Sequence, residues 1–73
     1  MERFSKGQRV KIVAGEYATS MEGRAGSVHR LRKGDTGAWV EMDLEVPSEH
    51  RKFPAGDARA NHLLLFPEEC EPE

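Results

Sequence analysis

The sequence has few of the features that would cross-link a fold covalently or anchor it in a membrane. Its 73 residues include one cysteine, Cys70, which excludes an intramolecular disulfide and leaves a small core or a homo-oligomer to hold the fold. The longest apolar run, residues 63–66, is far shorter than the ~20 residues that cross a bilayer. No positively charged start leads into an apolar signal segment, so we expect a cytoplasmic protein that does not contact membranes.

Motifs for catalysis are also missing. None of the three histidines stands at a metal-ligand spacing with another histidine or with the cysteine, and there is no glycine-rich phosphate loop or nucleophile elbow. We therefore expect no enzyme activity, no catalytic residue, no metal and no cofactor. His62 precedes three leucines and is interpreted as a strand-start residue with local hydrogen bonds. Cys70 lies between two glutamates, which should raise its pKa and make it an inert tail thiol.

What is present is a series of short strand patterns separated by turn residues. Val10 and Ile12 alternate with basic residues after Gly7, which predicts a first strand within residues 6–13. Residues 15–23 predict a loop whose Tyr17 and Met21 either cover the core as a lid, the reading we favour, or make contacts outside it.

A second strand is expected over residues 27–31. Val28 and Leu31 both look inward but have opposite parity, so burying both requires a bulge or strong bend, and Gly26 marks a bulge or a close backbone approach. Residues 33–37 (KGDTG) predict a hairpin. The clearest alternation follows, at Ala38, Val40, Met42 and Leu44, which are expected to face inward and to leave Trp39 outward.

The last third combines a long loop and one more strand. Residues 46–61 contain two prolines and no regular period, and their Phe53 is either a core contact or a binding residue. Residues 62–66 predict a buried strand that Pro67 stops, with a short 3-10 turn expected near Pro67. No segment predicts a helix. We expect one all-β domain over residues 1–73, an antiparallel barrel of about five strands with its core in 6–67 and an acidic tail at 68–73.

Charge is distributed unevenly along the chain. Residues 1–33 carry eight Lys or Arg against three Asp or Glu, a net of +5, and residues 34–73 carry three against ten, a net of −7. Such a split is either solvated surface charge or a basic face that steers an acidic partner. On the second interpretation the candidate partner-binding residues are the basic side chains and loop aromatics Arg9, Lys11, Tyr17, Arg24, Arg30, Arg32, Lys33, Trp39 and Phe53.

Two resemblances add to this interpretation. Gly7, Val10, Ile12 and Gly15, followed by Gly23-Arg24-x-Gly26-x-Val28, resemble the KOW motif of ribosomal proteins and transcription elongation factors. That resemblance implies a Src-homology-3-like (SH3-like) barrel and RNA or DNA binding. The loop at 15–23 is longer than is typical of the family and carries glutamates where basic residues are expected.

The layout of the whole chain is similar to the small barrel subunits of photosystem I and ferredoxin:thioredoxin reductase. The segments that carry this similarity are VKIV, EGRAGSV, the strand after Trp39 and Asn61-His62. It implies an accessory docking subunit of an electron-transfer complex. We expect first a non-catalytic module that docks onto a protein or protein–nucleic-acid assembly, with nucleic-acid binding and the electron-transfer role as alternatives.

Overall fold

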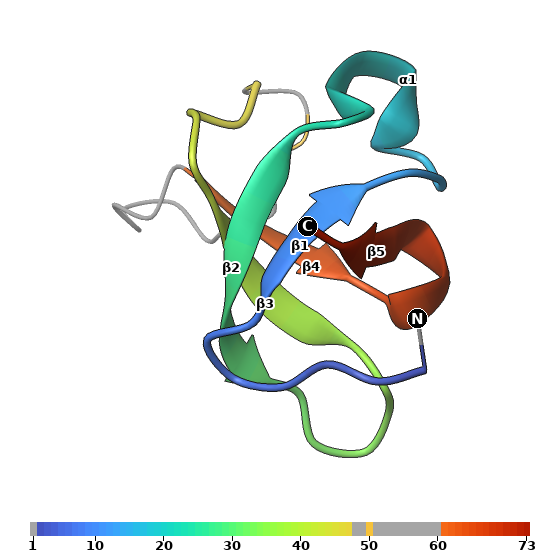
Figure 1. Cartoon of the computed structure of the whole chain (residues 1–73), viewed down its shortest axis with the longest axis vertical. Coiled ribbons are helices and arrows are strands. Elements are labelled where there is room, and N and C mark those ends of the chain that lie inside the picture. Colours follow the sequence, from blue (N-terminus) through green and yellow to red (C-terminus); the bar gives the residue numbers. More distant parts are fainter. Residues whose placement is uncertain (1, 48–49, 51–60) are drawn as a thin grey trace.

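In the part of the chain that the structure describes, the protein is a curled antiparallel sheet with a short helix and a 3-10 turn before its last strand (Figure 1). It was analysed as a computed structural model that describes residues 2–47, 50 and 61–73. The elements within those ranges are β1 (Arg9–Ile12), α1 (Ala18–Met21), β2 (Ala25–Leu31), β3 (Ala38–Met42), β4 (His62–Leu65), η2 (Pro67–Glu69) and β5 (Cys70–Pro72).

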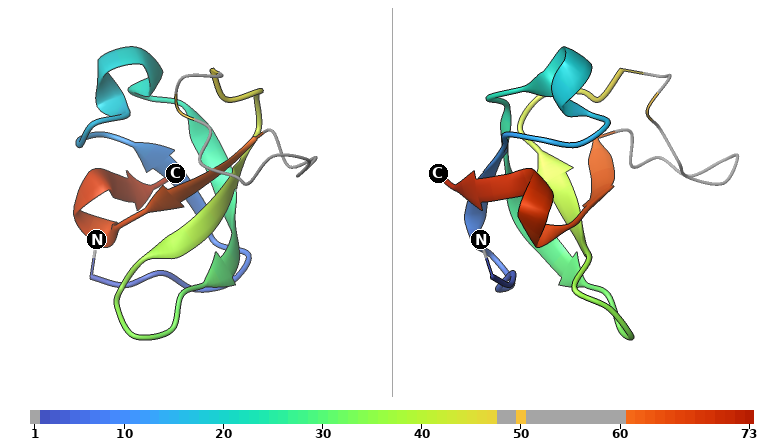
Figure 2. Two further views of the ribbon diagram at one scale, coloured as in Figure 1. Left: turned by 180° about the vertical axis from the view of Figure 1, so that it is seen from behind. Right: turned by 90° about the vertical axis from the view of Figure 1, so that its right-hand side faces the viewer.

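The strands form one sheet in the order β4-β3-β2-β1-β5, and every pairing is antiparallel. The sheet curls so that its two outer strands, β4 and β5, lie on the same side of the molecule, joined by η2 (Figure 2). The expected all-β antiparallel barrel of about five strands is confirmed, as is the 3-10 turn at Pro67. The sequence analysis missed α1 because four residues are too few to show a helical period.

The core lies on the inner face of this curled sheet. The alternating apolar residues that the sequence assigns to the interior are buried on β1, β3 and β4, with exposed fractions of 2% or less. Val28 of β2 joins them, and the inward orientation of Ala38, Val40 and Met42 is confirmed. The buried apolar set is Phe4, Val10, Ile12, Tyr17, Met21, Val28, Ala38, Val40, Met42, Val46, Leu63, Leu65 and Cys70.

The segment between β1 and β2 covers one end of the barrel. Tyr17 and Met21, at the start and end of α1, are 2% and 0% exposed. The lid interpretation is therefore confirmed, and Tyr17 is not available as a surface contact. The helix is held by the hydrogen bond that the Met21 N–H donates to the Tyr17 carbonyl, at 2.8 Å.

Two leucines expected inside are exposed. Leu44 is 63% exposed because β3 ends at Met42 and the alternation does not continue beyond it. Leu31 is 49% exposed at the last position of β2, although the predicted bulge is present and places it opposite Ala38. Register alone did not bury it, because Leu31 is the last residue of the strand and borders the turn that follows.

The core also extends beyond residues 6–67 at both ends. Phe4, in the segment that precedes β1, is 5% exposed. Cys70, assigned to an acidic tail from the sequence, is 2% exposed and begins β5, where it pairs with Ile12. The physical reason is the open edge of β1, whose unpaired N–H and C=O groups on that side are satisfied by β5.

Candidate functional site

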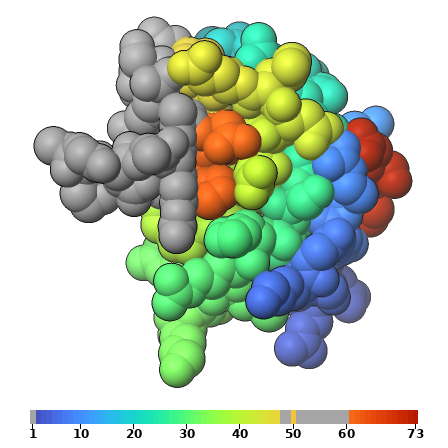
Figure 3. Space-filling model, turned by 90° about the vertical axis from the view of Figure 1, so that its left-hand side faces the viewer, coloured from blue at the N-terminus to red at the C-terminus, as the bar shows by residue number. Residues whose placement is uncertain are grey.

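A bulge in β2 decides which side chains reach the outer face of the sheet. Val28 pairs with Val40 and Arg30 pairs with Trp39, so β2 carries one extra residue, His29, at this point. A bulge re-aims the side chains around it. Arg30 therefore shares the outer face with Trp39, and His29 stands beside it. Figure 3 shows this face, with β4 in orange beside the green and yellow-green atoms of β2 and β3.

Close packing of β2 against β3 fixes this register. Gly26 is buried, and a Cβ built on it would lie 2.6 Å from the Glu41 carbonyl oxygen and 3.0 Å from Met42 Cα. The position therefore requires glycine for its close backbone approach, one of the two roles expected for it.

The hairpin between β2 and β3 carries a shallow hollow of about 390 Å³, which we call the Trp39 hollow. The hairpin is closed by the Arg32 N–H, which donates to the Gly37 carbonyl at 3.0 Å, and by the Gly37 N–H, which donates to Asp35 Oδ1 at 2.9 Å. The predicted turn at residues 33–37 is thus confirmed. The residues that line the hollow are Arg30, Leu31, Arg32, Lys33 and Trp39.

The cations of the Trp39 hollow differ in their partners. Arg32 Nε lies 3.4 Å from Asp35 Oδ2, within the same turn. Arg30 and Lys33 are exposed, and neither makes an ion pair with any residue in the described ranges. Two positive charges are therefore available to an outside partner beside an exposed leucine and a half-buried tryptophan.

The other predicted binding residues lie elsewhere. Arg9 is bound to Asp43 and Glu73, and Lys11 Nζ lies 3.2 Å from Glu71 Oε1, so acids of the same chain already occupy both cations. Arg24 is half-buried before β2, away from the residues that line the hollow. Phe53 lies outside the described residues.

A larger hollow of about 510 Å³ lies between the start of α1 and η2. Three carboxylates, Glu16, Glu68 and Glu69, line it together with Leu64, and none of the described residues that line it is basic. Of the predicted binding residues that the structure describes, only Tyr17 contributes to it. Its size does not make it the better candidate, because its charge is opposite to that of the predicted binding face.

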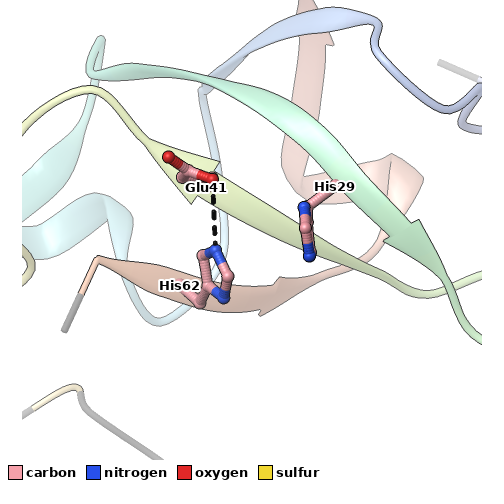
Figure 4. Close-up of side chains that lie close together, drawn as sticks. All are labelled: His29, Glu41 and His62. Atoms are coloured by element: carbon pink, nitrogen blue, oxygen red, sulfur yellow. Dashed lines mark hydrogen bonds and ion pairs between the residues drawn. The ribbon is translucent and has the colours of Figure 1, made fainter. Parts of the chain in front are cut away.

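The outer face also carries a cluster of titratable side chains, His29, Glu41 and His62, which we call the His–Glu cluster (Figure 4). One nitrogen or oxygen atom from each residue lies within 4.8 Å of the others. His62 Nε2 lies 3.4 Å from Glu41 Oε2, and the two residues are direct partners in the β3–β4 ladder. The imidazole rings of His29 and His62 stack with centroids 4.8 Å apart and planes 30° apart.

Sequence spacing could not reveal this cluster. Its members come from three neighbouring strands, and local ligand motifs detect only residues that are close along the chain. His62 does begin β4, as predicted, but its partner is on β3 rather than local. The pairing of β2 with β3 and of β3 with β4 would have been needed to predict it.

The comparisons with known proteins add no identity. No protein-family model, curated protein or solved structure matches this chain. Within the described ranges no helix has the length and apolar character needed to cross a membrane.

Proposed function

We propose that this protein is a non-catalytic interaction module that docks an acidic segment of a partner protein at the Trp39 hollow. The observation that carries the proposal is the gathering of Arg30, Lys33 and Trp39 around one hollow, beside the exposed Leu31. Four of the nine residues selected from the sequence meet there, namely Arg30, Arg32, Lys33 and Trp39.

Charge supports an acidic partner. Of the three cations that line the hollow, Arg32 contacts a carboxylate of this chain, so the hollow attracts an outside anion mainly through Arg30 and Lys33. Complementary charge at the rim of an interface speeds association and selects the partner more than it adds affinity. The partner segment should therefore be acidic, and its binding should weaken as salt rises.

Apolar surface supports a protein segment over a nucleic acid. Leu31, which lines the hollow, is 49% exposed, and tryptophan and arginine are the residue types enriched at binding hot spots. Nucleic acids are held mainly by phosphate contacts, and two available cations provide few of these. We expect a partner that combines Asp or Glu with one apolar side chain, bound with micromolar affinity because the contact area is small.

The experiment is a selection from a random peptide library, followed by affinity measurements by fluorescence anisotropy. Selected peptides should be rich in acidic residues and should bind Lys33→Glu at least tenfold more weakly than the unmodified chain. Lys6→Glu is the matched control, because Lys6 is exposed and does not line the hollow. Amide resonances of residues 30–33 and 39 should shift when a selected peptide is added.

Two outcomes would count against the proposal. If Lys33→Glu and Lys6→Glu weaken binding equally, only net charge is being sensed and the hollow is not the site. If labelled single-stranded RNA binds at ~50 mM salt more tightly than any selected peptide and loses affinity with Lys33→Glu, the nucleic-acid alternative replaces the protein partner.

A further inference from the structure

We propose that the His–Glu cluster, His29, Glu41 and His62, binds one divalent transition-metal ion of the zinc class. Two imidazoles and one carboxylate form a common ligand set for Zn²⁺ and its neighbours, whereas Mg²⁺ and Ca²⁺ prefer sites made of oxygen alone. The proposal does not depend on the docking function. The cluster shares no residue with the Trp39 hollow.

The spacing of the ligand atoms is close to what such an ion requires. Ligand atoms at ~2.0–2.2 Å from a tetrahedral Zn²⁺ are roughly 3.3–3.5 Å apart. His62 Nε2 and Glu41 Oε2 already stand 3.4 Å apart. All three ligand atoms lie within 4.8 Å of one another, so the remaining gap is about 1 Å, which side-chain rotation can close.

Burial gives the three ligands different roles. His62 is 5% exposed and is fixed by its place in β4, so it forms the floor of the site. His29 and Glu41 are exposed and can move to close on an ion. Three protein ligands leave a fourth coordination position of a tetrahedral ion for water or for a ligand from a partner, as in catalytic zinc sites.

The third ligand comes from a third strand. A cross-strand pair such as Glu41 and His62 is an ordinary feature of a sheet. His29 follows the inward-facing Val28 on β2 and adds a second imidazole on the outer face, stacked on the first at a centroid distance of 4.8 Å. An ion held there would link β2, β3 and β4, and would stabilise the folded chain by mass action.

The test uses the whole chain, stripped of metal with a chelator and titrated with Zn²⁺ at about pH 7.5, where metal competes well with protons for imidazole nitrogens. Calorimetry should give one ion per chain, and the midpoint of thermal unfolding should rise with Zn²⁺. His29→Gln and Glu41→Gln should each weaken binding at least tenfold. Both positions are exposed, so these variants should fold, and the unfolding midpoint without metal verifies this.

The matched controls are His50→Gln and Glu22→Gln. His50 Nε2 contacts Ser20 Oγ at 2.8 Å and is not part of the cluster, and Glu22 is exposed after α1. Both controls should keep full affinity. In nitrogen-detected NMR, the ring nitrogens of His29 and His62 should shift on adding Zn²⁺ while those of His50 stay in place.

Absence of binding at millimolar Zn²⁺ would overturn the proposal. So would binding that His29→Gln and Glu41→Gln leave unchanged, or binding that His50→Gln removes. None of these results would bear on the Trp39 hollow, because the peptide affinities of Lys33→Glu and Lys6→Glu are measured without metal.

Discussion

Arg9 on β1 holds Asp43, two strands away, across the intervening strand β2. Its Nη1 donates to Asp43 Oδ1 at 2.7 Å and its Nη2 donates to the second carboxylate oxygen. The same guanidinium donates to Ser27 Oγ on β2 at 3.0 Å and to Glu73 Oε1, after β5, at 2.9 Å. Arg9, which was predicted from the sequence to bind a partner, therefore binds side chains of its own chain instead.

The first prediction concerns the pKa of Asp43. Its hydrogen bonds from Arg9 hold this pKa below the ordinary value of 3.8. Arg9→Gln should raise it toward 3.8 in a carbon-detected NMR titration, and Lys11→Gln should not change it, because Lys11 pairs with Glu71. If Arg9→Gln leaves the pKa of Asp43 unchanged, the contact between Arg9 and Asp43 is absent in solution.

The sign of the stability change with pH follows from the direction of this shift. A carboxylate whose folded pKa is lowered stabilises the fold fully above its unfolded pKa, 3.8, and loses that contribution as pH falls through the lower folded value. The stability difference between the unmodified chain and Arg9→Gln should therefore shrink below about pH 4. Both side chains are solvent-exposed, so added salt should shrink it as well.

The second prediction concerns Phe4, which precedes the core that was expected over residues 6–67. Phe4 is 5% exposed within the core cluster, so Phe4→Ala should lower the free energy of unfolding by about 3–5 kcal/mol. Leu44→Ala is the control, and the 63% exposure of Leu44 predicts a loss below about 0.5 kcal/mol. Urea denaturation measures both. Equal losses would mean that residues before β1 do not pack as described.

The third prediction concerns Gly26. Gly26→Ala would drive a methyl group against the backbone of Glu41 and Met42, so strands β2 and β3 would have to separate. The expected loss is about 1–3 kcal/mol. Gly34→Ala is the contrast, because at Gly34 (φ +92°) the backbone disfavours a side chain but nothing lies within 4 Å of the new Cβ.

Gly34→Ala should cost only the backbone strain, about 1 kcal/mol. The two variants should also differ in their effect on amide resonances near the Trp39 hollow and the His–Glu cluster. Only Gly26→Ala should shift the amide resonances of Glu41, a member of the cluster, and of Met42. A larger loss for Gly34→Ala than for Gly26→Ala would contradict the close approach.

The fourth prediction concerns Cys70. Burial, and to a smaller extent Glu69 and Glu68, raise the pKa of its thiol to about 12. The raised pKa predicted from sequence is confirmed in direction, but burial rather than a neighbouring carboxylate is the main cause. Labelling with a thiol reagent should be slow in the native protein and fast in denaturant. Glu68→Gln should leave native labelling slow, and fast native labelling would contradict the burial of β5.

The stability contribution of this thiol also has a defined pH window. Because its folded pKa is raised, its contribution is fully present below the unfolded value of 9.0 and is lost as pH rises toward about 12. Cys70→Ala should remove this part of the alkaline destabilisation. A comparison of urea midpoints at neutral and alkaline pH measures the effect.

Sequence reasoning succeeded where structure is local. Val10 and Ile12, the alternation from Ala38 to Met42, and the turn at residues 33–37 all carry their own periodic or turn signals. It failed for β5, because residues 70–72 have no apolar alternation and are extended through pairing with β1. Leu31 and Leu44 were misplaced because their exposure depends on where strands end.

The candidate sites needed more than local pattern. Arg30 and Trp39 meet because they are strand partners, and the His–Glu cluster needs the order of three strands. Even with the correct strands, a regular β2 would have alternated His29 and Arg30 between the two faces. The hypothesis of a basic contact face stays a prediction, and it is limited to fewer residues because Arg9, Lys11 and Tyr17 are engaged elsewhere.

The single additional residue at the bulge has a consequence for recognising distant relatives. Deleting His29 would keep Val40 opposite Val28, Trp39 opposite Arg30 and Ala38 opposite Leu31. The Trp39 hollow would keep its residues, whereas the His–Glu cluster would lose one of its three members. A one-residue gap at this position of β2 is thus the mark by which homologues without the cluster should be recognised.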